Sequence, residues 1–338
     1  MRVLLWNHRF DEIAKCPDWN TPYRWITESL TAQNIEVYRH PGLRLRFDVE
    51  TSASLTAADL VIYSHTTARH VRGFDGPQWF VKSTGPGKFH TTLDPLGYGP
   101  YSSITYEKPP FDQVSDEEVE RFFEEEAGRW GNTGDSKWGK GLFGNCEVPF
   151  EEYILVLTQT LRDETVTNMF FGDYLNSLKI VIHSLALTTD LPIVVKIHPW
   201  TDPHKGFVNG QPVPSGETAI TESVLTVISA ISPKVHCFTG FTSVHSFFPR
   251  ARAVVLCNSG AGIEALLHKK PIISWGFPEY HWVTYDLRHA CDMERALSLE
   301  WVNQQAADRF TYWYVTQYCL YSYESAVRRV SELLDKLN

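Results

Sequence analysis

Short apolar runs alternate with amphipathic stretches from the beginning of the sequence. Val3–Trp6 is continuously apolar and predicts a buried strand, and Thr21–Gln33 predicts a helix with Pro22 in its first turn. Further short strands are expected at Glu36–Tyr38, Leu60–Tyr63 and Trp79–Val81. Polar or glycine-bearing turns separate these runs, so the pattern predicts an α/β domain with a doubly wound sheet.

The alternation weakens between Gly85 and Pro149, where glycine, proline and aromatic residues dominate. One acidic helix is expected within this stretch, at about residues 115–127, and its run Glu124–Glu126 is typical of a solvated helix face. We interpret residues 85–149 as an irregular insertion and linker, which would close an N-terminal Rossmann-like domain of residues 1–150.

A second series of strands and helices begins with the apolar run Tyr153–Leu157. The elements expected after it are helices at about 166–187, 222–232, 243–248 and 261–267, and strands at 193–197, 235–238, 253–256 and 271–275. Strands that alternate with crossover helices form parallel sheets. Residues 151–338 are therefore expected to form a second Rossmann-like domain that ends in C-terminal helices. The fold class is α/β, with two doubly wound parallel-sheet domains facing a cleft.

Composition agrees with two ordinary globular domains. The 338 residues are enough for two hydrophobic cores, and 43% hydrophobic with 21% charged residues gives no reason to expect disorder. The formal net charge of -9 disfavours a general affinity for nucleic acid or for an anionic membrane surface. The six cysteines form no C-x-x-C pair, so they indicate neither a zinc site nor a disulfide framework.

The apolar start Met1–Trp6 is too short for a signal peptide, and Asn7-His-Arg9 interrupts it. No run approaches the roughly 18 apolar residues of a membrane-spanning helix. We expect a cytoplasmic protein that could act at the periphery of a membrane, and the sequence leaves its oligomeric state open.

The residues after each strand are candidates for ligand binding, because ligands of parallel sheets bind at the carboxyl ends of the strands. The run Val254–His268 is a strand that turns through Ser259-Gly260-Ala-Gly262 into a helix. Backbone N–H groups and the Ser259 hydroxyl could bind a nucleotide phosphate there, and Glu264 could accept hydrogen bonds from ribose hydroxyls. Alternatively, the glycines only permit close packing of the helix on the strand, and Glu264 is solvated.

A second group is Lys196-Ile-His198-Pro199, at the end of an apolar strand. An ammonium and an imidazole can share the negative charge of a phosphate or of a departing nucleotide. The alternative is that His198 has a structural role.

A third group, Gln159 to Asp163, follows the strand Tyr153–Leu157. Asp163 is expected to act as a base or a nucleophile, and the alternative is that it caps the following helix.

A fourth group lies in the loop Trp275–Trp282, which follows the last strong strand. Tyr280, His281 and Trp282 could offer flat faces to a base or a sugar. The alternative is that these aromatic side chains close the core.

Taken in order, these motifs resemble those of the capsule polysaccharide biosynthesis family. The residues that carry the resemblance are Leu157, Gln159, Asp163, Lys196–Pro199, Asn258–Ala265, Pro278–Tyr280 and Trp282. The family includes bacterial transferases that move Kdo (3-deoxy-manno-octulosonic acid) from its CMP-activated form. Where the family often has Lys-Pro-His-Pro and Tyr-Ala-Gly-Trp, this chain has Lys-Ile-His-Pro and Tyr-His-Trp, and these departures concern the donor sugar more than the fold.

The resemblance implies a B-type glycosyltransferase that moves a sugar from a nucleotide sugar to a glycan or another hydroxyl acceptor. It implies no metal and no cofactor beyond the donor, with the donor in the C-terminal domain and the acceptor at the N-terminal one. The expected catalytic residues are Asp163 and His198. The expected donor-binding residues are Gln159, Lys196, His198, Asn258, Ser259, Gly260, Gly262, Glu264, Tyr280 and Trp282.

Three alternatives remain open. A UDP-sugar 2-epimerase would share the architecture, but such enzymes usually carry two consecutive glutamates where this chain has Glu264-Ala265. A transferase that modifies nucleic acid would need a local basic patch, for which Arg39, His40, Arg44, Arg46 and the run Lys82–Lys88 are the candidates. A non-catalytic sugar-binding scaffold is the last alternative.

Overall fold

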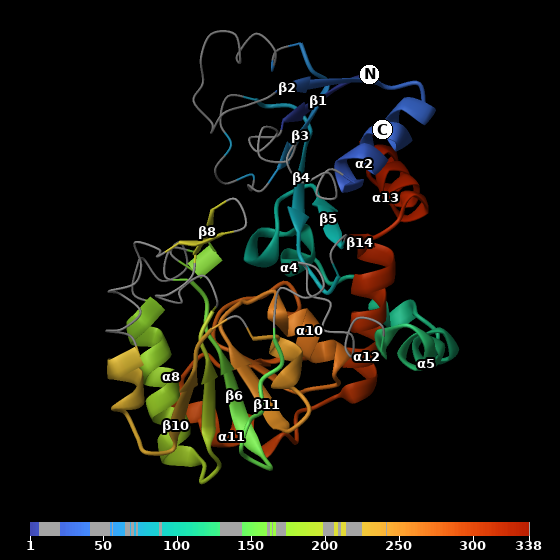
Figure 1. The fold of residues 1–338 in the computed structure, drawn as a ribbon. Helices are drawn as coiled ribbons and strands as arrows, with labels where there is room; N and C mark the ends of the chain where they lie inside the picture. The colour runs from blue at the N-terminus through green and yellow to red at the C-terminus, as the bar shows by residue number, and fades with distance from the viewer. Residues whose placement is uncertain are drawn as a thin grey trace. The chain divides into compact units, whose positions relative to one another are not determined.

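The chain folds into two compact units (Figure 1). The computed structural model describes residues 1–6, 21–40, 55, 57–64, 68, 71, 74–87, 90–128, 144–160, 163, 165–166, 174–198, 206–208, 211–213, 225–240 and 242–337. Unit 1 combines Met1–Pro110 with Tyr312–Asn338, and unit 2 is the continuous segment Phe111–Thr311.

Unit 1 is built on a six-stranded sheet in the order β14-β5-β4-β3-β1-β2. Its strands are β1 (Arg2–Trp6), β2 (Glu36–His40), β3 (Leu60–Ser64), β4 (Gln78–Ser83), β5 (Thr91–Asp94) and β14 (Cys319–Leu320). The strands β2, β1, β3 and β4 are parallel, and β5 and β14 extend the sheet in antiparallel fashion. The continuous apolar runs of β1 and β3 bury side chains on both faces, as parallel strands require.

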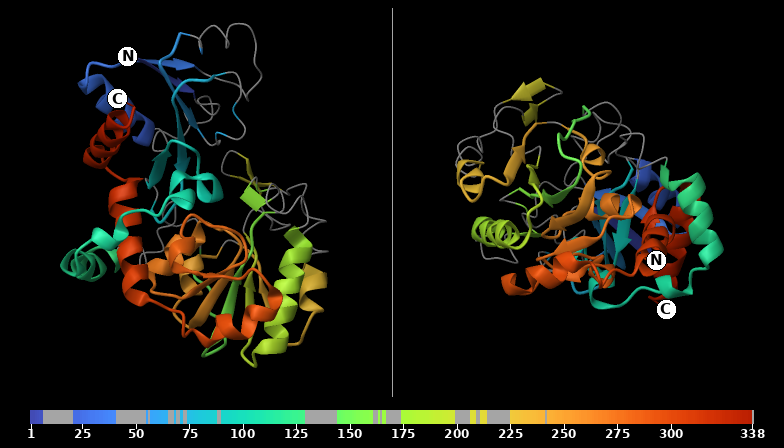
Figure 2. Two further views of the ribbon diagram at one scale, coloured as in Figure 1. Left: turned by 180° about the vertical axis from the view of Figure 1, so that it is seen from behind. Right: turned by 90° about the horizontal axis from the view of Figure 1, so that it is seen from below.

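Two helices from opposite parts of the sequence cover one face of this sheet. They are α2 (Thr21–Ala32) and α13 (Tyr323–Asp335), which lie side by side in Figures 1 and 2. Ile26 and Leu30 of α2 share one apolar cluster with Val330 and Leu333 of α13 and with the strands beneath them. The apolar face of α13 is therefore part of the core of unit 1.

Unit 1 contains shorter elements in the stretch that the sequence analysis treated as irregular. These are β5, the helix α4 (Ser103–Tyr106) and a 3-10 turn at Gly99–Tyr101. Asp94 at the end of β5 is fully buried and accepts hydrogen bonds from the Gly97 and Ser103 N–H groups, at 3.0 and 2.9 Å, and from the Tyr318 hydroxyl at 2.8 Å. This buried carboxylate thus connects the end of β5 to the C-terminal segment.

Unit 2 contains a fully parallel sheet in the order β10-β7-β6-β11-β12-β13. Its strands are β6 (Tyr153–Leu157), β7 (Ile193–Lys196), β10 (Val235–Phe238), β11 (Ala251–Leu256), β12 (Ile272–Ser274) and β13 (Tyr285–Asp286). Numbered along the chain within this sheet, the order is 3-2-1-4-5-6, which is that of the dinucleotide-binding Rossmann fold. The expected α/β class with Rossmann-like sheets is confirmed.

In the part of unit 2 that the structure describes, the helices include α5 (Asp116–Glu125), α8 (Tyr174–Thr188), α10 (Ala261–Leu267), α11 (Met293–Ser298) and α12 (Gln304–Trp313, which ends two residues into unit 1). Shorter 3-10 turns lie at Phe111–Gln113, Val244–Ser246, His281–Val283 and Ala290–Asp292, and a π-helical turn, Tyr314–Tyr318, follows α12. A small hairpin pairs β8 (Gly206–Val208) with β9 (Gln211–Val213). The helices α8 and α11 pack on the same face of the sheet, where Leu178, Ile182, Met293 and Ala296 join one core cluster.

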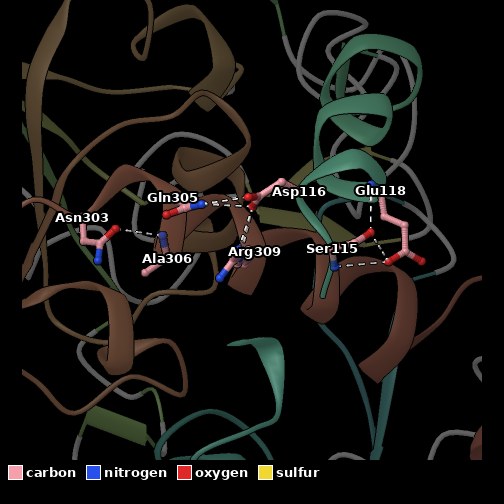
Figure 3. A network of polar contacts seen from close by, with 7 residues as sticks. All are labelled: Ser115, Asp116, Glu118, Asn303, Gln305, Ala306 and Arg309. Atoms are coloured by element: carbon pink, nitrogen blue, oxygen red, sulfur yellow. Dashed lines mark hydrogen bonds and ion pairs between the residues drawn. The ribbon is translucent and has the colours of Figure 1, made fainter. Parts of the chain in front are cut away.

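The division into units differs from the boundary at residue 150 expected from the sequence. The segment from residue 312 onward belongs to unit 1, because β14 pairs with β5 and Arg329 donates to the Leu93 carbonyl at 3.1 Å. The helix α5 belongs to unit 2, because Asp116 accepts hydrogen bonds from Arg309 and Gln305 of α12 at 2.8 and 3.0 Å (Figure 3).

Candidate functional site

The strand order of unit 2 reverses between β6 and β11. The chain runs from β6 to β7 and β10 on one side of this pair, and from β11 to β12 and β13 on the other. In open parallel sheets, the carboxyl ends of the strands at such a reversal form the usual ligand crevice. Thr158 and Gln159 follow β6, and Asn258 and Ser259 follow β11 closely, so two of the expected groups lie at this reversal.

Gln159 and Asn258 join the two loops through paired hydrogen bonds. The Gln159 Nε2 donates to Asn258 Oδ1 at 2.7 Å, and the Asn258 backbone N–H donates to Gln159 Oε1 at 3.0 Å. Asn258 Nδ2 also donates to the Thr165 carbonyl at 3.0 Å. Both amide side chains are buried, so these contacts fix the position of the two loops.

Tyr174 supports the same arrangement from α8, and sequence reasoning missed it. Its hydroxyl oxygen accepts a hydrogen bond from the Gln159 backbone N–H at 3.0 Å. Complete burial raises the pKa of Tyr174 well above its usual range, so the phenol remains neutral. A tyrosine at the start of a helix carries no distinctive sequence signal for such a contact.

Asp163 has a local capping contact. Its Oδ1 accepts hydrogen bonds from the Thr165 backbone N–H at 2.9 Å and from the Thr165 hydroxyl at 2.6 Å. The Thr165 hydroxyl also lies 3.2 Å from Asn258 Oδ1, so Asp163 is connected to the pair of joined loops. The capping alternative therefore has direct support, and a catalytic role for Asp163 remains a prediction.

Lys196 is held by main-chain carbonyl groups. Its side chain is buried, and Nζ donates to the carbonyl oxygens of Ile197 at 2.9 Å and Gly240 at 3.1 Å. These contacts link the ends of the neighbouring strands β7 and β10. The described contacts use the ammonium to order two loops, and the expected contact of Lys196 with a ligand stays a prediction.

His198 lies in the next turn and is only half-buried. Its backbone N–H donates to the Thr158 hydroxyl at 2.9 Å, which joins the loop after β7 to the loop after β6. The neighbouring Pro199 lies outside the described residues. His198 thus belongs to the same group of loops as Gln159 and Asn258.

The loop Ser259–Gly262 contacts Tyr280 closely. The Tyr280 hydroxyl donates to the Ser259 carbonyl, and a Cβ added at Gly262 would lie 2.2 Å from the Tyr280 ring. Gly262 therefore permits close packing, as the structural alternative proposed. Gly260 differs, because nothing lies within 4 Å of a Cβ added there, and the Ser259 hydroxyl accepts from the Ala261 N–H at 3.3 Å.

Tyr280 does not offer its ring to a ligand as expected, because it is 1% exposed. His281 and Trp282 are half-buried, and their ring centroids lie 4.4 Å apart. Burial lowers the pKa of His281, and the hydrogen bond to the Pro278 carbonyl offsets part of this effect. His281 and Trp282 therefore retain accessible aromatic surface, as do Phe277, which is 36% exposed, and Trp275, which is half-buried.

Glu264 is in the first turn of α10 and is buried rather than solvated. Its Oε1 lies 3.6 Å from Nε2 of His245, and His245 Nδ1 lies 2.9 Å from His268 Nε2. Sequence reasoning missed both histidines. The only available signal was the four-residue separation of Glu264 and His268, which places them on one helix face.

The parts of the chain that the structure describes contain no group of three or more His, Cys, Asp or Glu side chains arranged to hold a metal ion. Among the same residues, no helix has the length and apolar character needed to span a bilayer.

The two units define an α/β protein with two Rossmann-like sheets. A family model described as "Capsule polysaccharide biosynthesis protein" matches residues 148–321, and the chain belongs to this family, as its motifs predicted. Together, family and fold make the chain a glycosyltransferase.

Two solved transferase structures share the fold at low sequence identity. The β-Kdo 2,4-transferase KpsC of Thermosulfurimonas dismutans is 14% identical, with a TM-score of 0.54 over 90% of this chain and 89% of that chain. The β-Kdo 2,7-transferase KpsC of the same organism is 14% identical, with a TM-score of 0.51 over 99% and 100%. The UDP-GlcNAc 2-epimerase of Methanocaldococcus jannaschii has a TM-score of 0.40 at 12% identity, over 99% and 100%. No curated protein matches the sequence.

Proposed function

We propose that the chain transfers a Kdo-like acidic sugar from a CMP-activated donor to a hydroxyl group of a glycan. Family membership and the fold shared with two transferases named for Kdo support the choice of sugar. The observation that carries the proposal is the hydrogen-bonded pair Gln159–Asn258, which holds two loops together at the strand-order reversal of a Rossmann sheet.

In this proposal the donor phosphate lies against Ser259, Gly260 and His198. The Ser259 hydroxyl accepts from the Ala261 N–H, so its own hydrogen is directed elsewhere and is available for a phosphate oxygen. The open space beside the Gly260 Cα lets a ligand approach the backbone. Trp282 and His281 would flank the base or the sugar.

Two charges develop during the transfer, and the site must stabilise both. The departing nucleotide gains negative charge, which the Ser259 hydroxyl and the His198 imidazole would stabilise. The sugar becomes oxocarbenium-like, and Asp163 would act on it as a nucleophile, giving retention, or on the acceptor hydroxyl as a base, giving inversion. We propose Asp163 for this carboxylate role and leave the stereochemical outcome to measurement.

The acceptor is proposed to bind unit 1. The alternative nucleic-acid acceptor relied on Arg39, His40, Arg44 and Arg46, whose side chains lie outside the described residues. The acidic net charge of -9 favours a glycan acceptor over a polyphosphate one.

A nucleotide panel tests the proposal directly. CMP, UDP, GDP and dTDP are each added at the same concentration, and a nucleotide present at about 100 times its dissociation constant should raise the melting temperature by roughly 5–10 °C. We expect CMP to stabilise the protein most, and Ser259→Ala to weaken this effect while Ser298→Ala, on an exposed helix end, leaves it unchanged.

An assay of turnover with and without an acceptor then distinguishes a glycosyltransferase from an epimerase. CMP-Kdo with a glycan acceptor should release CMP only when the acceptor is present. Stabilisation by UDP alone, with epimerised UDP-sugar formed in the absence of acceptor, would replace the proposal with the epimerase alternative.

A further inference from the structure

One buried histidine lies between Glu264 of α10 and His268, the residue that follows the last turn of that helix. Glu264 and His268 are four residues apart, so they lie on the same face of the helix, one turn from each other. His245, in the 3-10 turn Val244–Ser246, faces both of them. Its Nδ1 is 2.9 Å from His268 Nε2, and its Nε2 is 3.6 Å from Glu264 Oε1.

His245 is buried, and one of its two ring nitrogens lacks a hydrogen-bond partner in the described part of the chain. The residue is 7% exposed, and its Nε2 has no hydrogen-bond partner among the residues that the structure describes. The Glu264 carboxylate lies close to this nitrogen, with Oε1 3.6 Å away. A buried ring nitrogen without a partner is costly, so a small movement of Glu264 towards it is favourable.

The proton positions follow from the geometry. A carboxylate beside Nε2 favours a proton on that nitrogen, because two lone pairs would repel each other. His245 Nδ1 is then an acceptor in the neutral ring, and it receives the Nε2 proton of His268. His268 therefore donates to His245, and the Nε2 proton of His245 lies on the side of the Glu264 carboxylate, whose Oε1 is 3.6 Å away.

Packing fixes the two imidazole rings in this arrangement. Phe248 is fully buried, and its ring centroid lies 5.9 Å from that of His245 and 4.9 Å from that of His268. The nitrogen separation of 2.9 Å fits a direct hydrogen bond. The three side chains thus form a chain of fixed order that ends on the carboxylate.

We propose that His245 and His268 are positioning residues for Glu264, which they hold in the orientation that binds the ribose of the donor nucleotide. This inference rests on the proposed function, since it assumes that the nucleotide lies at the end of β11. The Glu264 side chain keeps 11% of its surface exposed, and we assign the ligand contact to this exposed part.

The main test compares His245→Phe with the wild type. Phenylalanine keeps the ring that packs on Phe248 but removes both nitrogens. We expect the dissociation constant for CMP, measured by calorimetry, to rise about tenfold. The KM for the donor should rise likewise, with kcat at saturating donor within about twofold. The matched control is His289→Phe, an exposed histidine of the same unit, which should bind CMP as the wild type does.

A conservative variant separates positioning from packing. In His245→Gln the amide N–H replaces the Nε2 donor, so CMP affinity should recover at least partly, and His268→Gln should weaken it less than His245→Phe. If His245→Phe does not fold, the CMP affinities of His245→Gln and His245→Leu are compared instead, provided that the two variants have similar melting temperatures.

Two results would overturn the inference. In the first, a folded His245→Phe protein binds CMP with wild-type affinity while Glu264→Gln binds it more weakly. The histidines would then have no positioning role, although Glu264 would still belong to the donor site. Wild-type affinity in Glu264→Gln would instead remove Glu264 from the donor site, and the inference would fail with that part of the proposed function. Nitrogen-15 spectra give a direct check on the proton order: an Nδ1-protonated neutral His245 would contradict it.

Discussion

The carboxylate of Asp163 has a visible capping contact and a proposed catalytic role, and one set of variants distinguishes them. A cap acts on stability, so Asp163→Ala should cost about 1 kcal/mol and Asp163→Asn should restore the protein. A catalytic carboxylate acts on the barrier, so Asp163→Asn should fold, bind CMP and lose turnover by at least about a hundredfold. Near-normal turnover of the folded Asn variant would leave only the cap.

Gly262 and Gly260 differ in the space around them, and this difference predicts opposite results for the same substitution. A Cβ at Gly262 would lie 2.2 Å from the Tyr280 ring, whereas one at Gly260 would meet nothing within 4 Å. Gly262→Ala should therefore lower the free energy of unfolding by about 1–3 kcal/mol. Gly260→Ala should leave it nearly unchanged, as denaturant titration can show. Equal losses for both variants would contradict the close packing at Tyr280.

At this scale the sequence predicted which loops carry the polar groups, but not what each side chain contacts. Lys196 donates to carbonyl groups and Tyr280 is buried, although a lysine and an aromatic residue after strands could equally have faced a ligand. Whether such a side chain contacts the protein or a ligand depends on which loops are its neighbours. The pairing of strands such as β7 and β10, which sets these neighbours, is known only from the fold.

Among the elements, the end of β5 depends on Asp94. Asp94→Ala would leave the N–H groups of Leu96, Gly97 and Ser103 without their acceptor in the buried end of the sheet. We expect a loss of about 3 kcal/mol or more in the free energy of unfolding. Tyr318→Phe removes a single donor and should cost about 1 kcal/mol. A loss for Asp94→Ala no larger than that for Tyr318→Phe would contradict this view.

The attachment of α5 to α12 predicts a dependence on pH (Figure 3). Hydrogen bonds from Gln305 and Arg309 lower the pKa of Asp116 below its ordinary value. A carboxylate whose pKa is lower in the folded state stabilises that state at pH values above its unfolded pKa of about 4. This contribution is lost as the pH falls through the folded pKa. Asp116→Asn should therefore lower the melting temperature by on the order of 1 °C at pH 7 and by less near pH 3.

The control for that pH effect is Glu117→Gln, which removes an exposed charge from the same first turn of α5. This variant also removes a carboxylate that interacts with the helix dipole, but it leaves the contact between Asp116 and Arg309 intact. If Glu117→Gln and Asp116→Asn show the same dependence on pH, the contact with α12 has no part in it.

The longer apolar strands were predictable as elements, and the shortest strands were not. The expected strands at β1, β3, β6 and β11 agree with the structure because each shows a clear run of apolar residues, and the expected helix α10 agrees as well. The strands β5 and β14 have four and two residues, too few for a periodic signal, and they form by pairing with neighbours distant in the sequence.

For the whole molecule, we expect activity to survive chelation. The proposed phosphate contacts come from a hydroxyl, an imidazole and backbone N–H groups, which need no metal ion to stabilise the leaving group. CMP release with acceptor present should be equal, within about twofold, before and after treatment with EDTA. Loss of activity that Mg²⁺ or Mn²⁺ restores would contradict this expectation.

The division into units is the feature that the sequence predicted least well. The alternation of strands and helices marks where a sheet begins, but it does not say which sheet a later segment joins. The contacts that assign α13 to unit 1 are apolar packing on α2 and a hydrogen bond to the Leu93 carbonyl, and both join segments more than 200 residues apart.

This discontinuity of unit 1 has a consequence for synthesis on the ribosome. The sheet of unit 1 begins with residues 2–6, yet its last strand and the helix that covers it come from residues 319–335. Unit 2 is continuous and is translated completely before those residues exist. During translation, the part of α2 that packs on α13 therefore stays uncovered while all of unit 2 is made, and we expect a chaperone to bind the nascent chain there.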